Sequence, residues 1–297
     1  MKSMSMARST GSYPRFWQGA RFQQTMRQAI IFSLLVAIAI VMVLPFAWMV
    51  STALKASGAE FSYPPQLLPH PAHWENFREA LTVLPFHLFF RNTLIITVSN
   101  VIGTLVVASM AAYAFARVRF FARNVWFGIV LATMMIPSAV TMVPNYVIMS
   151  RIGWVDTFLP LIVPAILGGG AFYIFVLRQF FLGIPKELDE AAIMDGAGHI
   201  RILTQIILPL SKPALASVAV LNFIGQWNEF LYALIYLNTM ENKTLALGLR
   251  MFQAQYETSW NLMMAASAVV ILPVLLVFFW AQRYFVEGVA LSGLSGR

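Results

Sequence analysis

The chain alternates between long apolar runs and short polar segments. Six runs are free of charged residues or nearly so, and they cover residues 28–54, 92–116, 124–150, 157–177, 213–238 and 258–282. A helix needs about 20 residues to cross about 30 Å of hydrocarbon, and every run is that long. The pattern therefore predicts an all-α integral membrane protein with six spans, of which only the fifth is interrupted by an acidic residue, Glu229.

The polar segments around these runs predict tails and loops. Residues 1–27 are rich in Ser and Arg, and they predict an N-terminal tail before a retained first span, since no clear cleavage site precedes that span. Residues 55–91 predict an external loop that is extended at 61–71, where prolines lack a backbone N–H and restrict their predecessors. We expect residues 92–285 to form a core of five spans and residues 286–297 to form a C-terminal tail.

Proline and glycine inside two of the runs predict irregular helices. Pro137 and Pro144 predict a kink in the third span, where neighbouring helices and side chains can satisfy the freed carbonyl groups. The fourth run contains Gly168-Gly169-Gly170, which weakens a helix at membrane depth. This triple glycine marks close helix packing, a break that lines a pathway, or a hinge.

Composition excludes several classes of protein. The chain has 297 residues, of which 11% are charged, and its mean hydropathy is +0.73, so it has too few polar groups to cover the surface of a soluble globule. It has no cysteine, which excludes disulfides, thiolate chemistry and cysteine metal sites. The net charge of +8 reflects basic residues at the ends of apolar runs. We therefore read the charge as membrane topology and expect no nucleic-acid partner.

The distribution of Lys and Arg predicts the orientation of the chain. If both termini are cytoplasmic, fourteen of the 20 basic residues lie on the inner side. The other six lie on the outer side, and they are Lys55, Arg78, Arg91, Arg151, Lys243 and Arg250. Because cytoplasmic loops carry the excess of Lys and Arg, both termini and the connection between the fourth and fifth runs are expected inside.

That connection is a polar, acid-rich segment in an otherwise apolar region. Pro185 suits the first turn of a helix, and the acidic residues that follow it complement the helix dipole. Gly196 and Gly198 then permit a turn. A second short helix near residues 200–207 would present Ile200, Leu203 and Ile207 on one face. Two short helices joined by glycine make a compact knob that fits a cleft in a soluble partner.

The spacing in this knob resembles the EAA loop of ABC importer permeases. Glu190-Ala191-Ala192 is followed by three residues, Gly196, nine residues and Ile206-Ile207-Leu208-Pro209. The Asp195-Gly196-Ala197 triplet, the segment 111–120 and Trp227-Asn228-Glu229-Phe230 are similar to the carbohydrate-uptake, maltose-permease branch. The resemblance implies a six-helix type I permease bundle with a cytoplasmic coupling loop. It implies these ATPase-coupling residues: Glu190, Ala191, Ala192, Asp195, Gly196, Ala197, Ile206, Leu208 and Pro209.

The resemblance also implies partners and a location. The partners are a second permease subunit, two ATPase subunits, an extracytoplasmic solute-binding protein, membrane lipid and a sugar-like solute. The location is a bacterial inner membrane. This chain has no Gly-x-x-x-x-Gly-Lys-Ser/Thr loop, so we expect no cofactor and no enzymatic activity in it. ATP-Mg is expected on the partner ATPase subunits.

Polar residues inside the runs are candidates for contact with a solute. Asn222, Gln226 and Glu229 are spaced i, i+4 and i+7, so they share one helix face. A second polar stripe follows Thr93, Thr97, Asn100 and Thr104, and a weaker third follows Thr133, Thr141 and Asn145. The candidates for a pathway or gate are Asn222, Gln226, Asn228, Glu229, Thr97 and Asn100. The alternatives are interhelical packing for the amides and hydroxyls and structural hydrogen bonding for Glu229.

Two other classes of protein compete with this interpretation. An ion-coupled secondary transporter or channel usually places several ionisable residues at mid-membrane, whereas this chain has one acid near the outer end of a span. A membrane-embedded enzyme needs clustered catalytic groups, whereas the four histidines are scattered over loops and an interface. His70-x-x-His73 is a weak metal pair, and no metal site is expected.

Overall fold

The computed structural model describes residues 16–254 and 259–294, and within them all regular secondary structure is helical. The elements in chain order are α1 (Phe16–Ala53), α2 (Glu75–Thr82), α3 (Phe86–Arg117), α4 (Arg123–Thr133), α5 (Ser138–Arg151), α6 (Leu159–Gly168), α7 (Ala171–Leu182), α8 (Glu187–Met194), α9 (His199–Ile202), a π-helix (Leu203–Ile207), α10 (Leu208–Leu210), α11 (Lys212–Trp227), α12 (Leu231–Tyr236), a 3₁₀ turn (Met240–Asn242), α13 (Leu245–Ala254), α14 (Trp260–Val270) and α15 (Leu272–Leu294).

Helix α3 is the centre of the bundle, and it contacts α6, α7, α11 and α13. Its buried face is lined by small residues such as Ala108, Ala112 and Ala116, which let neighbouring backbones come close. Gly103 has no room for a Cβ beside Ile166 of α6. The largest buried apolar cluster joins this face of α3 to α7, α11 and the segment 199–207.

The N-terminal end of α3 is tied to the loop after α12. The Asn92 amide donates hydrogen bonds to the carbonyls of Glu241 and Lys243 at 2.6 and 3.0 Å. The Thr93 hydroxyl accepts a hydrogen bond from the backbone N–H of Leu245 at 2.9 Å. Both side chains are at most 2% exposed. These bonds satisfy backbone groups that helix ends leave free, and they fix the loop to α3.

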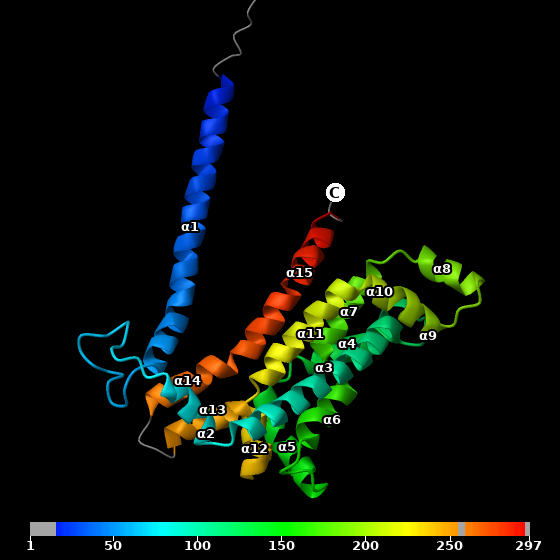
Figure 1. Ribbon diagram of the computed structural model, residues 1–297. Helices are drawn as coiled ribbons and strands as arrows, with labels where there is room; N and C mark the ends of the chain where they lie inside the picture. The colour runs from blue at the N-terminus through cyan, green and yellow to red at the C-terminus, as the bar shows by residue number, and fades with distance from the viewer. Residues whose placement is uncertain (1–15, 255–258, 295–297) are drawn as a thin grey trace, which may run out of the picture.

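Helix α1 stands apart from the bundle and meets it only near its C-terminal end, where it packs on α14 (Figure 1). Every side chain from Phe22 to Ala47 is exposed, and most are apolar. Such a helix is stable only where lipid or another protein covers it. The backbone is already helical at Phe16, so the expected tail 1–27 is wrong from that residue onward. Once nucleated, a helix extends at little cost through residues that do not break it.

Four segments are long and apolar enough to cross a membrane, and two bent helix pairs raise the number to six in the described residues. One bent pair corrects the expected third span, 124–150, because α4 and α5 meet at 93°. Pro137 precedes α5, where it cannot donate a hydrogen bond to the preceding turn and restricts Ile136. Pro144 lies inside α5 and does not end it.

The other expected boundaries also shift. The second span begins at Phe86 instead of residue 92. The fifth run, 213–238, is divided into α11, which ends at Trp227, and α12, with a short break between them. Helix α15 continues to Leu294 and so takes in most of the expected tail, whose last three residues lie outside the described part. No proline interrupts the chain after Pro273, and the helix therefore continues.

The triple glycine separates α6 from α7. Gly169 and Gly170 have φ of +60° and +66°, a left-handed conformation that costs other residues about 1–2 kcal/mol. Gly169 also lies against α3, since a Cβ there would be 3.1 Å from Val107 Cγ1 and 3.2 Å from the Ala108 nitrogen. The glycines therefore provide both a helix break and close packing.

Gly169→Ala is expected to destabilise the bundle by about 1–3 kcal/mol, because it adds backbone strain and crowds α3. The matched control is Gly168→Ala, since Gly168 is helical and a Cβ there meets no atom within 4 Å. Thermal unfolding of the two purified variants in detergent compares them directly. Equal thermal unfolding midpoints for Gly169→Ala and Gly168→Ala would show that a Cβ at residue 169 causes neither backbone strain nor crowding against α3.

Candidate functional site

The polar segment of the sequence forms a knob that projects from one end of the bundle (Figure 1). This knob, residues 185–211, consists of α8, α9, the π-helix and α10. Helix α8 ends in a glycine turn in which Gly196 has φ of +78°. Its N–H donates to the Ile193 carbonyl at 2.9 Å, and the N–H of Ala197 donates to the Ala192 carbonyl at 2.9 Å. This pair of bonds is a Schellman motif, which needs glycine at the left-handed position.

The Schellman motif explains the spacing of the EAA sequence. Ala192 and Ala197 are the residues that a Schellman motif brings into apolar contact, and both pack on the buried cluster that α3, α7, α11 and residues 202–207 share. Ile206 and Leu208 pack on the same cluster. Four of the nine expected coupling residues therefore pack inward on this cluster.

The other five coupling residues point away from the bundle. Exposed residues of the motif are Glu190, Ala191, Asp195, Gly196 and Pro209. Beside them lie large apolar side chains that are also exposed, namely Ile193 at 55%, Met194 at 88% and Ile200 at 78%. An exposed apolar patch with an acidic rim is typical of a surface that binds another protein.

The second half of the knob differs from the expected single helix. It begins as α9 and continues as a π-helix over Leu203–Ile207, which changes the angle at which successive side chains leave the axis. Leu203 and Ile207 are buried as expected, but Ile200 is not on their face. Ile202, at 1% exposed, takes the inward position instead.

Two side chains from the C-terminal turns of α3 hold the knob. The Arg117 guanidinium donates from Nη2 to the carbonyls of Phe181 and Ile184 at 2.7 and 2.5 Å, and its Nη1 lies 3.5 Å from Oδ2 of Asp189. The Arg117 and Asp189 side chains are only 3% and 13% exposed. One turn earlier, the Tyr113 hydroxyl lies 3.3 Å from Nδ1 of His199. Helix α3 thus contacts both halves of the knob.

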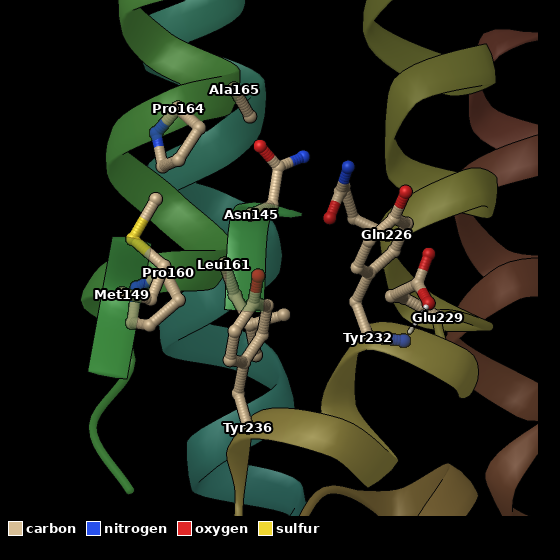
Figure 2. A pocket seen from close by; sticks show the side chains of 10 residues that line it. All are labelled: Asn145, Met149, Pro160, Leu161, Pro164, Ala165, Gln226, Glu229, Tyr232 and Tyr236. Atoms are coloured by element: carbon tan, nitrogen blue, oxygen red, sulfur yellow. Dashed lines mark hydrogen bonds between the residues drawn. The ribbon is translucent and has the colours of Figure 1, made fainter. Parts of the chain in front are cut away.

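A pocket of about 290 Å³ lies near the other end of α11. It is bordered by α5 and α6 on one side and by α11 and α12 on the other (Figure 2). Its lining residues are Asn145, Met149, Pro160, Leu161, Pro164, Ala165, Gln226, Glu229, Tyr232 and Tyr236. The amides of Asn145 and Gln226 face each other across the gap (Figure 2).

Glu229 lies in the break between α11 and α12. Its Oε1 accepts a hydrogen bond from the backbone N–H of Tyr232 at 2.9 Å, which caps the first turn of α12. The same side chain lines the pocket. Glu229 therefore forms the structural hydrogen bond that the sequence analysis offered as one alternative. Its role in a pathway or gate stays a prediction.

The remaining candidates lie elsewhere. Asn222 is buried against Thr104, with 3.5 Å between the amide nitrogen and the hydroxyl oxygen. Asn100 donates to the carbonyls of Ile96 and Leu161 at 2.9 and 3.2 Å. Thr97 is fully buried, and Asn228 is exposed and donates to its own helix. None of these four candidates, Asn222, Asn100, Thr97 and Asn228, lines the pocket.

A row of tyrosines borders the pocket and was not among the expected residues. The ring of Tyr236 stacks between those of Tyr146 and Tyr232, with centroids 6.1 and 6.4 Å away. Their only sequence signal is the i, i+4 spacing of Tyr232 and Tyr236 after the Trp-Asn-Glu-Phe segment. Their stacking with Tyr146 depends on the approach of α5, which the sequence does not reveal.

Asp156 fixes the end of α12 and thereby the position of Tyr236. Its Oδ1 accepts hydrogen bonds from the backbone of Asn238 and Thr239 at 2.9 and 3.0 Å, and its own N–H donates to the Tyr236 carbonyl at 2.8 Å. Partial burial raises the pKa of Asp156, but the hydrogen bonds from Thr239 and Asn238 outweigh it and hold the pKa below its usual value. The carboxylate therefore stays charged at neutral pH.

The chain is similar to several proteins of known class. Residues 104–290 match the family described as binding-protein-dependent transport system inner membrane component. The trehalose/maltose transport system permease protein MalG of Thermococcus litoralis is 33% identical over 88% of this chain and 94% of that protein. The arabinooligosaccharides transport system permease protein AraQ of Halalkalibacterium halodurans is 34% identical over 83% of this chain and 86% of that protein.

A solved structure agrees in fold. A chain from a bacterial ABC transporter involved in the import of the acidic polysaccharide alginate matches with a TM-score of 0.75 and 26% identity, over 93% of this chain and all of that chain. The expected fold class, an all-helical type I permease, is confirmed by this match and by the family. The chain belongs to the family of binding-protein-dependent transport system inner membrane components, the permeases of ABC importers.

Proposed function

We propose that this chain is the permease subunit of an ATP-driven importer that moves a sugar or sugar-like solute across a bacterial inner membrane into the cytoplasm. The observation that carries the proposal is the knob, in which one set of motif residues packs inward and another is exposed. Its family membership and the sugar transport named for its relatives support the proposal.

The exposed half of the knob is the proposed docking site for an ATPase subunit. Glu190 and Asp195 supply negative charge, and Met194 and Ile200 supply apolar contact. A ligand shifts a conformational equilibrium only if its affinity differs between the two states. The knob is therefore expected to fit the ATPase differently when nucleotide is bound, and ATP-Mg is expected on the two ATPase subunits.

A second permease subunit and an extracytoplasmic solute-binding protein complete the proposed assembly. The long exposed face of α1 supports cover by lipid and by the second subunit, because it leaves an apolar helix without a neighbour in this chain. The excess of Lys and Arg on the knob side supports a cytoplasmic knob and cytoplasmic termini. The loop 238–244 would then face the binding protein.

Energy coupling separates this function from an ion-coupled transporter or channel. Cells that express the full assembly are expected to stop accumulating labelled trehalose or maltose when ATP is depleted while the proton gradient is maintained. An uncoupler applied while ATP is clamped should leave initial uptake nearly unchanged. Uptake that survives ATP depletion and collapses with the uncoupler would overturn the proposal. A strain without this chain supplies the background rate.

A further inference from the structure

We infer that this subunit itself carries a sugar-binding site in the pocket between α5, α6, α11 and α12, and that the site takes a neutral, hydroxyl-rich sugar unit and disfavours an anionic one. The inference rests on the proposed function for its physiological meaning. The binding and its charge preference are properties of the pocket alone. They can therefore fail while ATP-driven import stands.

The polar groups of the pocket suit sugar hydroxyls. An amide offers both donors and acceptors, as a hydroxyl requires. The side chains of Asn145 and Gln226 form no hydrogen bond with any described residue, yet both are partly buried and face each other across the pocket (Figure 2). Partly buried amides without protein partners are available to a ligand.

The apolar surfaces of the pocket suit the faces of a sugar ring, which carry C–H groups. The rings of Tyr232 and Tyr236 and the side chains of Met149, Pro160 and Leu161 supply apolar surface to the lining (Figure 2). Binding sites for small molecules combine such apolar walls with a few placed polar groups. The volume of about 290 Å³ is just below the usual range for ligand pockets, about 300–1,000 Å³. It suits one sugar unit at a time.

The charge of the pocket sets the class of sugar. Glu229 is the acidic residue in its lining, and no Lys, Arg or His is among the lining residues. One oxygen of the Glu229 carboxylate caps α12, while the other accepts no hydrogen bond from the described residues and is free to accept one from a hydroxyl. A carboxylate or phosphate on the solute would meet like charge in a partly desolvated site. Neutral sugars would therefore bind, and uronates or sugar phosphates would be rejected.

Saturation-transfer NMR on the purified permease–ATPase assembly, without the binding protein, tests this inference. The probes are trehalose and maltose as neutral sugars and digalacturonate as the anionic one. We expect saturation transfer to the neutral sugars, and at least about tenfold weaker apparent affinity for digalacturonate. Equal or stronger binding of digalacturonate would overturn the charge preference. Absence of transfer to all three would overturn the site.

Three variants assign the signal to the pocket. Gln226→Leu and Tyr236→Ala are expected to lower the affinity for trehalose about tenfold or more. Leu234→Ala, a change on the same helix α12 at an exposed residue outside the pocket, should leave it unchanged. If Gln226→Leu and Tyr236→Ala bind trehalose like the unmodified protein, the site is elsewhere and the inference is wrong.

Glu229→Gln is expected to increase the binding of one ligand, a result that misfolding cannot produce. The glutamine oxygen can still cap α12 by accepting from Tyr232, while the negative charge is lost. Digalacturonate binding should rise about tenfold or more toward that of trehalose, with trehalose binding retained. Unchanged discrimination would exclude Glu229 as its cause. If ATP-driven uptake persists while every pocket test fails, the importer function stands and only the site is rejected.

Discussion

Gly196→Pro is expected to abolish solute uptake while the chain still inserts into the membrane. Proline fixes φ near −65° and has no N–H, whereas Gly196 has φ of +78° and donates to the Ile193 carbonyl. The Schellman motif cannot form, so the exposed end of α8 loses its direction relative to α9. Insertion should persist because the spans lie outside the knob. Uptake at matched expression is the measurement.

Glu190→Lys tests the same surface without any change of backbone. Glu190 is exposed in the first turn of α8 and contacts no other described side chain through a hydrogen bond or ion pair. Reversal of its charge should therefore leave the fold of this chain unchanged. It should abolish uptake by weakening the contact with the ATPase subunit. The control is Gly198→Ala, since Gly198 has an extended backbone and space for a Cβ. Normal uptake in Glu190→Lys and Gly196→Pro would remove the knob from the coupling mechanism.

Arg117→Ala is expected to lower transport at least about tenfold and to uncouple ATP hydrolysis from it. Removal of one partner from a buried ion pair costs about 3–5 kcal/mol, and here two backbone carbonyls of the α7 end also lose their donor. Movements of the knob should then no longer be transmitted to α3, so ATP hydrolysis would continue without transport. The measurements are uptake and ATPase activity of the same purified assembly in liposomes.

Two companion variants separate positioning from simple destabilisation. Arg119→Ala removes an exposed arginine two residues away and should leave transport and ATPase activity unchanged. Asp189→Asn removes the charge of the ion pair but keeps the carbonyl contacts of Arg117, so an intermediate loss is expected. A destabilised protein would lose assembly and both activities together. If Arg117→Ala matches Arg119→Ala, the Arg117 contacts do not position the knob.

The spans could be predicted because a membrane helix is marked by its own composition. Charge-free runs of adequate length identified six segments, and proline identified the break near Pro137. The 93° bend could not be predicted, because a proline only removes a hydrogen bond and the packing of neighbours sets the angle. The break after Trp227 carries no proline or glycine, so local sequence gave no sign of it.

The candidate sites were predictable where a local rule fixes them. Gly196 could be predicted because a helix end favours glycine. Gln226 and Glu229 could be predicted because helical spacing places them on one face. Asn222 has the same spacing but lies one turn deeper, where Thr104 of α3 meets it. Arg117 and Asp156 owe their roles to residues far along the chain, and sequence periodicity cannot identify such contacts.

The unbroken course of α3 has a mechanical consequence. Its 32 residues form a strut about 48 Å long at about 1.5 Å per residue. Near its C-terminal end, Arg117 forms an ion pair with Asp189 of the knob. Near its N-terminal end, Asn92 donates a hydrogen bond to the loop after α12. A stiff strut converts a push at one end into displacement at the other without a relay of side-chain rearrangements. A movement of the knob is then expected to move the loop after α12 as well, because α3 connects the two as one rigid body.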